Sequence, residues 1–463
     1  MIGSKAFYAK EITSIRLSDS VKSIETSAFR DCSELKEVDL NKVETIGSYA
    51  FEDDTAIESI VLPETLKNVG RNVFYGSTKL TDITVRADIE SNADQIFNGA
   101  PAKNITFGSE CTKVPAKMFW GTGVEKITLP DNIKTIGGSA FRNCSELKEV
   151  DLNKVETIGN YAFEDDTAIE SIVLPETLKN VGSNVFNGCT ALTDITVSAD
   201  LESGADQMFS GAPAKNITFG SACTKVPGGM FYYTGVEKIT LPDNIKTIEG
   251  SAFRNCSELK EVDLNKVETI GNYVFEEDPG LTKIVFPKSL KKIGSDIFWN
   301  TEGIEYVEIY SENLNANSGS PVFGFSKSIK MVTIGEGVES LPKGLFIKSN
   351  VKTVCVNADN MTFDSCAFSE CDELGDVIFA GRHYTFADEN VFFSSPGVVL
   401  NAGAHSSVIP YAVDNNIKYK LTSEDLTDSY LNFDKTKLTI SSYSKLANYT
   451  EFQIDYAFKD AGT

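Results

Sequence analysis

Long apolar runs and catalytic side chains are what this sequence lacks. No stretch approaches the ~18 consecutive apolar residues that a membrane-spanning helix needs, so we expect no membrane insertion within the chain. The only histidines are His383 and His405, which leaves little for histidine-based chemistry. The motifs GxSxG and HExxH and the phosphate-binding loop are absent. We therefore expect no enzymatic activity, no catalytic residues, no metal and no cofactor.

Positive charge and paired cysteines are also scarce. A net charge of −23 argues against nucleic acid and anionic membranes as partners, because both require clustered Lys and Arg. The nine cysteines contain no CxxC pair, and most recur at repeated positions, so we interpret them as small buried hydrophobes. Cys355, Cys366 and Cys371 lie outside the copied blocks. The sequence leaves open whether Cys355 pairs with either of the others or is a free thiol.

Repetition takes the place of these motifs. Residues 27–54, 139–166 and 251–278 are nearly identical and lie 112 residues apart. Each block divides into shorter units marked by a phenylalanine every 22 or 23 residues, with longer steps before Phe323 and Phe392. A fixed period in the twenties, repeated 18 times, predicts a solenoid in which each unit is one coil.

One coil of the first block shows how the chain is expected to fold. Leu35, Val38 and Leu40 have the spacing L-x-x-V-x-L, so Val38 and Leu40 point inward from a strand while Asp39 points outward. Gly47 allows a tight bend before the next phenylalanine. We predict a mainly β solenoid of about 18 coils of 22–25 residues, with short helical or 3-10 turns and one long parallel sheet.

The recurring motif L-x-x-I-x-L-P…I-G-x-x-A-F-x-x-C resembles the leucine-rich repeats of the BspA-like family of bacterial surface antigens. The resemblance covers roughly residues 1–400 and recurs in every coil. It implies a leucine-rich-repeat solenoid. It also implies a secreted or surface-attached protein, since some members of the family are adhesins that bind host matrix or plasma proteins.

Three regions follow from the pattern. We predict a solenoid over 1–396, a C-terminal cap over 397–421 and a β-like tail over 422–463 that reads as the start of a further domain. Within the cap, HSSVIPYAVDNNIKYKL predicts a short helix, begun by Ser406 or Ser407, followed by a strand. The solenoid itself divides into three super-repeats, near 7–118, 119–230 and 231–345.

The first residues of the sequence also lead to a prediction. The opening MIGSKAF aligns with TIGSYAF at 45–51, so the sequence begins inside a coil. We expect a signal peptide and a surface anchor to lie outside this sequence.

Outward-facing positions change character late in the array. The regular Thr, Val and Asp give way to Tyr306, Glu308 and Met331, and then to Cys355 and Ile378. Irregularity in a repeat array indicates either a partner-binding site or drift near the end of the array. We treat Tyr306, Glu308 and Met331 as candidate partner-binding residues.

A second set of candidates follows the phenylalanines directly. Trp120 precedes Arg142 by one coil, which predicts a ring-on-guanidinium contact, and Trp299 occupies the same position later. Such residues either cover the edge of the solenoid or form a contact patch, since Trp, Tyr and Arg dominate binding hot spots.

Acidic triplets follow the phenylalanine in other coils. They lie at 52–54, 164–166 and 276–278, without the D-x-D-x-D-G spacing of a calcium loop. We expect them to form a solvated acidic edge.

Together these observations favour an extracellular or cell-surface interaction scaffold of a bacterium. We expect an adhesin that binds a host matrix or cell-surface protein through an extended solenoid surface, with glycans as second candidate ligands. The alternatives are a structural stalk or spacer that presents another domain, and a glycan-binding surface protein.

Overall fold

A computed structural model describes residues 1–90, 93–202, 204–316, 321–324 and 326–422, together with two short strands further on. The chain divides into two compact units, Met1–Val236 (unit 1) and Glu237–Thr463 (unit 2). Both units are parallel β-solenoids with little helix, about 17 turns in all, so the predicted fold class is confirmed.

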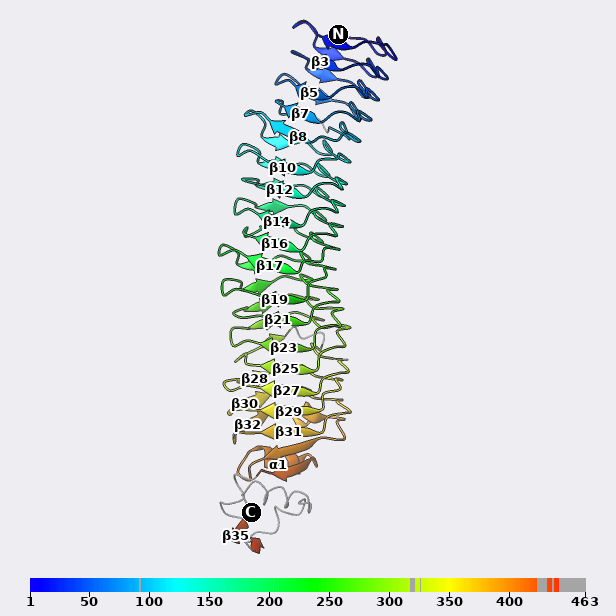
Figure 1. Cartoon of the computed structure of the whole chain (residues 1–463). Coiled ribbons are helices and arrows are strands. Elements are labelled where there is room, and N and C mark those ends of the chain that lie inside the picture. The colour runs from blue at the N-terminus through cyan, green and yellow to red at the C-terminus, as the bar shows by residue number, and fades with distance from the viewer. Residues whose placement is uncertain are drawn as a thin grey trace. The chain divides into compact units, whose positions relative to one another are not determined.

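Each coil of unit 1 contributes up to two short strands, which form two rows, and Figure 1 labels strands of the first row. The first row consists of β1 (Ser14–Arg16), β3 (Glu37–Asp39), β5 (Ser59–Leu62), β7 (Asp82–Val85), β8 (Asn104–Phe107), β10 (Lys126–Thr128), β12 (Glu149–Asp151), β14 (Ser171–Leu174), β16 (Asp194–Val197) and β17 (Asn216–Phe219). The second row consists of β2 (Ser23–Ile24), β4 (Thr45–Ile46), β6 (Asn68–Val69), β9 (Lys113–Val114), β11 (Thr135–Ile136), β13 (Thr157–Ile158), β15 (Asn180–Val181) and β18 (Lys225–Val226).

Unit 2 has the same two rows. Its first row consists of β19 (Lys238–Thr240), β21 (Glu261–Asp263), β23 (Lys283–Phe286), β25 (Tyr306–Ile309), β27 (Met331–Ile334), β29 (Thr353–Val356), β31 (Asp376–Phe379), β33 (Val399–Ala402) and β34 (Lys418–Leu421). The second row consists of β20 (Thr247–Ile248), β22 (Thr269–Ile270), β24 (Lys292–Ile293), β26 (Asn315–Ala316), β28 (Ser340–Leu341), β30 (Met361–Phe363) and β32 (Tyr384–Phe386).

The first-row strands pair in parallel with equivalent residues in register. Ile60 pairs with Ile83, and Ile83 pairs with Ile105. Alternate residues point into the coil, so Ile60 is buried while its neighbours Ser59 and Val61 are exposed. The first row is divided into shorter sheets. Strands β5, β7 and β8 form one in unit 1, and a seven-stranded sheet in unit 2 consists of β23, β25, β27, β29, β31, β33 and β34.

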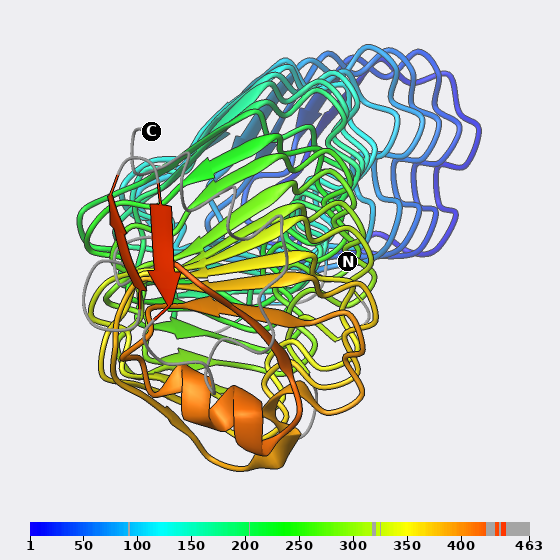
Figure 2. The same ribbon diagram turned by 90° about the horizontal axis from the view of Figure 1, so that it is seen from below.

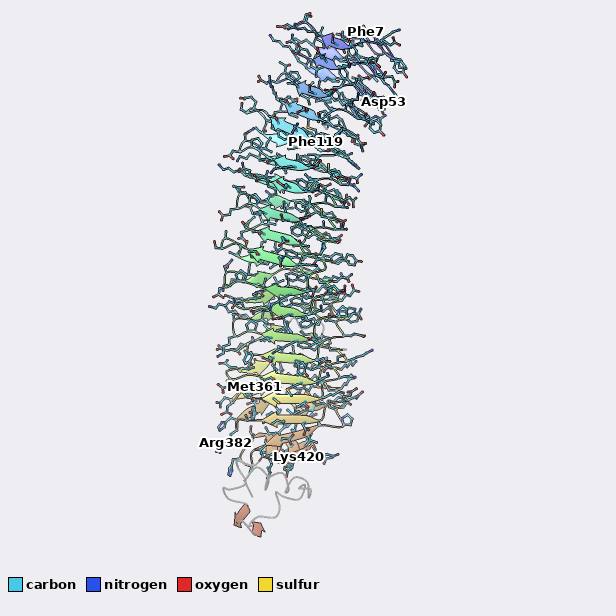
Figure 3. The ribbon with its side chains drawn as sticks, in the orientation of Figure 1. Phe7, Asp53, Phe119, Met361, Arg382 and Lys420 are labelled. Atoms are coloured by element: carbon cyan, nitrogen blue, oxygen red, sulfur yellow. The ribbon has the colours of Figure 1, made fainter. Side chains whose placement is uncertain are left out.

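Phenylalanine rings form the interior spine of each unit. In unit 1 the rings from Phe7 to Phe231 stack coil upon coil, with centroids 5.1–5.6 Å apart (Phe7 and Phe119 are labelled in Figure 3). In unit 2 the rings from Phe253 to Phe392 stack at 4.8–6.0 Å. Because each ring is covered by the rings of adjacent coils, a coil becomes buried only when its neighbours are in place.

The turns that carry these rings are themselves joined by hydrogen bonds. The Phe29 N–H donates to the Ala50 carbonyl of the next coil at 2.9 Å, and the Phe51 N–H donates to the Val73 carbonyl. The residue two before each of these phenylalanines is left-handed, with φ of 55° at Ser27. Among the described residues, helical structure is confined to the 3-10 turn η1 (Glu389–Phe392) and the helix α1 (Val408–Asp414) of unit 2.

A helix and a strand lie where the sequence predicted the C-terminal cap. Helix α1 begins after Ser407, and Pro410 lies in its first turn. The Ser407 hydroxyl donates to the Tyr384 carbonyl instead of capping the helix. In Figure 2, α1 is the orange helix at the C-terminal end of the coils of unit 2, where it contacts β33 and β34.

Little of the predicted β-like tail lies within the described residues. Strands β35 (Leu431–Asp434) and β36 (Lys437–Ile440) form an antiparallel pair there. The other residues between 423 and 463 lie outside the described part of the chain.

The acidic triplets correct one expectation. Asp54, Asp166 and Asp278 are fully buried, and Glu52 and Glu276 are buried as well, so the solvated acidic edge was a wrong prediction for these residues. The Cys32 N–H donates to the Asp54 carboxylate at 2.7 Å, whereas the second carboxylate oxygen is buried without a hydrogen-bond partner. Burial raises the pKa of Asp54 to about 8, and it raises the pKa of Asp166 and Asp278 well above the usual range.

The buried aspartates should make stability fall as the pH rises. The unfolded chain releases the Asp54 proton near pH 3.8, whereas the folded chain keeps it until about pH 8, so raising the pH across this window favours unfolding. We expect Asp54→Asn to raise the free energy of unfolding at pH 8 by about 1–3 kcal/mol, with a much smaller effect near pH 4. Urea unfolding at several pH values measures this difference.

Asp82→Asn is the matched control for that experiment. Hydrogen bonds from Thr81 and then Asn104 lower the pKa of the exposed Asp82 carboxyl, so this variant should gain no stability at pH 8. An Asp54→Asn variant with the same effect on stability at pH 4 and pH 8 would contradict the assignment.

Close approach of successive coils predicts a second effect. A Cβ atom on Gly47 would lie 2.6 Å from the backbone nitrogen of Thr26, which cannot move without displacing the preceding coil. Gly47→Ala should therefore lower the free energy of unfolding by about 1–3 kcal/mol. Gly3→Ala, where a Cβ meets nothing within 4 Å, should change it little. Equal thermal stability of the two variants would contradict this account.

Candidate functional site

The outer surface of the seven-stranded sheet in unit 2 brings three of the predicted site residues together. Cα register places Tyr306 beside Met331 on β25 and β27, and Glu308 lies in the next outward row, beside Thr333. Their common orientation follows from strand alternation, because residues two apart face the same side. We call this surface the seven-stranded face. Its outward rows are Lys283, Tyr306, Met331, Thr353, Asp376, Val399 and Lys418, and Val285, Glu308, Thr333, Cys355, Ile378, Asn401 and Lys420.

Apolar side chains are exposed near the middle of the seven-stranded face. Tyr306 is 42% exposed and Met331 39% exposed, on strands that lie about 4.8 Å apart. Ile378, on β31, is also exposed, and Cys355 lies next to it on β29, half-buried. Large apolar side chains that stay exposed on a sheet surface are of the kind that a partner covers, and the role of this patch in partner binding stays a prediction.

Ion pairs flank the apolar patch on both sides. The Lys283 ammonium lies 2.6 Å from the Glu308 carboxylate, which also accepts a hydrogen bond from the Tyr310 hydroxyl. Burial, together with the Glu308 charge, raises the pKa of Tyr310. Glu308 is thus half-buried and held in place, rather than a free outward carboxylate.

At the other end of the face, Lys420 and Asp376 form the second pair. Their charged groups are 3.8 Å apart, and the Asn401 amide donates to the same Asp376 oxygen at 3.0 Å (Lys420 is labelled in Figure 3). Sequence reasoning did not single out Lys283, Asp376 or Lys420. The two-residue alternation of the strands was the signal that could have found them, since it places all three in the outward rows.

The equivalent surface of unit 1 is polar except for single exposed valines, Val61 and Val173. On β5, β7 and β8 the outward residues are Ser, Val, Asp, Thr and Asn, and Asp82 accepts a hydrogen bond from the Asn104 amide at 2.8 Å. In such cross-strand pairs, the outward polar side chains find their hydrogen-bond partners within the sheet itself. The contrast with Tyr306 and Met331 distinguishes the irregular coils from the copied ones.

Trp120 and Arg142 lie on the turn edge of unit 1. The Arg142 guanidinium lies 4.9 Å from the Trp120 ring centroid, so the predicted stacking is present. Arg142 also forms a 2.7 Å ion pair with Glu164 and approaches Tyr161, at 5.7 Å from that ring. This guanidinium is therefore bound within the solenoid surface, and the role of both residues in partner binding stays a prediction.

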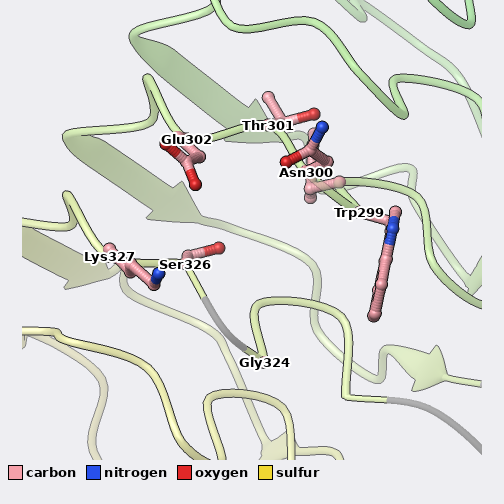
Figure 4. A pocket seen from close by; sticks show the side chains of 8 residues that line it. Trp299, Asn300, Thr301, Glu302, Gly324, Ser326 and Lys327 are labelled. Carbon is pink, nitrogen blue, oxygen red and sulfur yellow. The ribbon is translucent and has the colours of Figure 1, made fainter.

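Trp299 occupies the equivalent turn position in unit 2, outside the seven-stranded face. Its side chain is 51% exposed and lines a hollow of about 190 Å³ (Figure 4). Sequence reasoning found Trp299 from its place after Phe298 but missed the hollow, whose described lining comes from two successive turns.

The described residues offer little to metal or thiol chemistry. They contain no group of three or more His, Cys, Asp and Glu side chains that could hold a metal ion. None of the nine cysteines, which all lie in the described part of the chain, forms a disulfide, so Cys355 is not joined to Cys366 or Cys371. The Cys371 thiol is buried and donates to the Phe346 carbonyl at 3.1 Å, and burial raises its pKa to about 11. Within the same described ranges, no helix has the length and apolar character to cross a membrane.

Solved structures of bacterial repeat proteins are similar to this chain. A leucine-rich repeat protein from Bacteroides ovatus is 20% identical, with 89% of this chain and 91% of that chain covered and a TM-score of 0.48. The pneumococcal vaccine antigen PcpA is 21% identical, with 89% and 92% covered and a TM-score of 0.37. A protein from Faecalibacterium prausnitzii, described as a leucine rich cell surface protein, is 21% identical, with 78% and 83% covered and a TM-score of 0.33.

Sequence comparison points to one family. No curated protein shows significant similarity to the chain. The model of the BspA type leucine rich repeat region, which comprises six repeat copies, matches residues 1–123, 112–236, 224–323 and 308–399. These matches cover most of the chain and coincide with the coils described above. The chain belongs to the BspA-type leucine-rich-repeat family.

Proposed function

We propose that this chain is a bacterial cell-surface scaffold that binds a protein partner through the seven-stranded face and catalyses no reaction. The observation that carries the proposal is the pair of exposed apolar side chains, Tyr306 and Met331, on adjacent paired strands. Membership of the BspA-type family supports the surface location.

The chemistry of the face indicates the kind of partner. Tyr and Met are enriched in the buried centres of protein interfaces, whereas charged residues gather at the rim. The arrangement here is similar, because the pairs Lys283–Glu308 and Asp376–Lys420 flank the apolar patch. A protein that presents apolar anchor side chains, ringed by polar groups, fits this surface. A host matrix protein or a protein of a neighbouring cell is the proposed partner.

A triple substitution tests the location of the site. Tyr306→Ala, Glu308→Ala and Met331→Ala together should weaken partner binding about 100-fold or more, because hot-spot truncations cost more than ~1 kcal/mol each. Surface plasmon resonance against a panel of purified host matrix and plasma proteins measures the loss. Thermal unfolding checks that the variant is folded.

The matched control changes the same outward rows in unit 1. Asp82→Ala, Thr84→Ala and Asn104→Ala should leave the affinity unchanged, since these side chains lie on the polar sheet of β7 and β8. Undiminished binding by the Tyr306, Glu308 and Met331 variant would remove the seven-stranded face as the site.

A spacer role is the second candidate, favoured by the copied blocks. Residues 27–76 and 139–188 are identical at 46 of 50 positions, including exposed Lys36, Glu37 and Asp39. Separate selection on each coil would not keep exposed residues identical, so duplication of a whole block accounts for them. Block duplication lengthens an array without creating a new binding surface.

Deletion of one block separates the two roles. Removing residues 119–230 should leave the affinity for the partner unchanged, because the seven-stranded face lies wholly within unit 2. If the blocks act as a spacer, cells that display the shortened chain should adhere less well only where reach is limiting. If the shortened chain instead lost its affinity for the partner in solution, the copied coils would take part in binding.

A further inference from the structure

The methionine side chains of this chain differ strongly in exposure. All six methionines lie in the described part of the chain. Four of them are fully buried: Met118, Met208, Met230 and Met361. Met1 is 78% exposed at the beginning of the sequence, and Met331 is 39% exposed on β27 (labelled in Figure 1). Apart from Met1, therefore, only Met331 presents its thioether side chain to solvent.

Met331 lies on the outer surface of the seven-stranded face. Cα register places it between Tyr306 on β25 and Thr353 on β29. Val332, the next residue along the strand, points inward and is buried. Neighbouring residues of a strand face opposite sides, so a change at the Met331 sulfur alters the outer surface and leaves the interior packing in place.

An exposed thioether reacts with two-electron oxidants such as peroxides. The sulfur donates a lone pair to one oxygen of hydrogen peroxide, and an S–O bond forms as the O–O bond breaks. The departing hydroxide takes the proton of the transferred hydroxyl group and leaves as water. Sulfur is oxidised and the peroxide is reduced by two electrons. The product, methionine sulfoxide, carries a polar S=O group where the side chain was apolar.

The thiols of the chain compete poorly for the same oxidant. Seven of the nine cysteines are buried, and Cys355 and Cys366 are half-buried. Cys355 belongs to the outward rows of the seven-stranded face, where burial raises the pKa of its thiol. Because the thiolate is the reactive form, little of Cys355 is reactive at neutral pH. Met331 is therefore the sulfur of this face that a peroxide oxidises most readily.

We propose that Met331 is a modification site, at which oxidation to the sulfoxide switches off partner binding by the seven-stranded face. This inference rests on the proposed function, because the partner is the protein that covers Tyr306 and Met331. An apolar interface centre disfavours the S=O group, since its oxygen loses its hydration when the partner covers it. Methionine sulfoxide reductases return the thioether, so the switch is reversible.

The copied coils of unit 1 lack this switch. In the outward row that contains Met331, β7 and β8 carry Asp82 and Asn104. Neither a carboxylate nor an amide is oxidised by peroxide under conditions that oxidise a thioether. Sensitivity to oxidants is thus confined to the irregular coils, where the proposed partner binds.

Peptide mass spectrometry tests the modification without any partner. During timed exposure of the folded, full-length chain to hydrogen peroxide, Met331 should gain one oxygen atom at least about tenfold faster than the four buried methionines, because peroxide reaches its sulfur without unfolding of the coil. Met1 is the accessible reference within the same sample. Oxidation of Met331 at the rate of the buried methionines would overturn the proposal.

Affinity for the partner found by surface plasmon resonance tests the switch. The oxidised chain should bind about tenfold or more weakly, which is the loss expected when a hot-spot side chain is removed. Met331→Gln, a polar side chain of similar length, should show the same weakening without peroxide. Met331→Leu, which conserves volume and apolar character, should keep its affinity before and after treatment. Methionine sulfoxide reductases should restore binding by the oxidised chain, and thermal unfolding should be the same in all samples.

Cys355→Ser and Cys366→Ser are the thiol controls, and both should lose affinity on oxidation as the unsubstituted chain does. Equal losses in peroxide-treated Met331→Leu and the unsubstituted chain would overturn the switch. Full binding by the oxidised chain to a partner that the Tyr306, Glu308 and Met331 triple variant fails to bind would also overturn it, and would leave the proposed function intact. A partner whose affinity the triple substitution does not reduce would instead remove the proposed site, and the switch with it.

Discussion

Packing of each coil against its neighbours is the interaction on which the rest of this structure depends. A coil of 22 or 23 residues cannot enclose its own apolar side chains, and a ring such as Phe163 is buried because Phe141 and Phe186 cover its two faces at 5.3 and 5.1 Å. Backbone hydrogen bonds between turns follow the same register. This requirement fixes the inward residue types and the coil length, and it leaves the outward positions free.

Freedom at outward positions explains how one scaffold carries different surfaces. Asp82 and Asn104 satisfy each other across strands of unit 1, whereas Tyr306 and Met331 occupy the same rows in unit 2 without disturbing Val307 or Val332 beneath them. A change of surface chemistry therefore costs little stability. Irregular coil length is tolerated in the same way near Trp299, because Phe298 still stacks on Phe323 at 5.1 Å across a step of 25 residues.

Polar atoms inside the spine are the exception to an apolar interior. The Cys144 thiol donates at 3.1 Å to the Phe119 carbonyl of the preceding coil, an oxygen that also accepts from the Thr122 hydroxyl at 3.0 Å. Asp54 stands at the equivalent position of another coil and accepts from the Cys32 N–H, but it brings a second oxygen that no group satisfies. Duplication of the block repeated this buried, unsatisfied carboxylate oxygen at Asp166 and Asp278.

By itself the sequence determined the period, the parallel solenoid, the inward residues and the outward rows that contain Tyr306, Glu308 and Met331. Those features repeat along the chain, and periodicity is a local property that can be read without coordinates. The tertiary structure decided those features that depend on the distances between side chains of different coils. It buried Asp54 although its neighbours in sequence are acidic, it paired Glu308 with Lys283, and it covered Trp120 with Arg142 while leaving a hollow beside Trp299. Each of these outcomes depends on groups from successive coils more than 20 residues apart, whose separation no local pattern records.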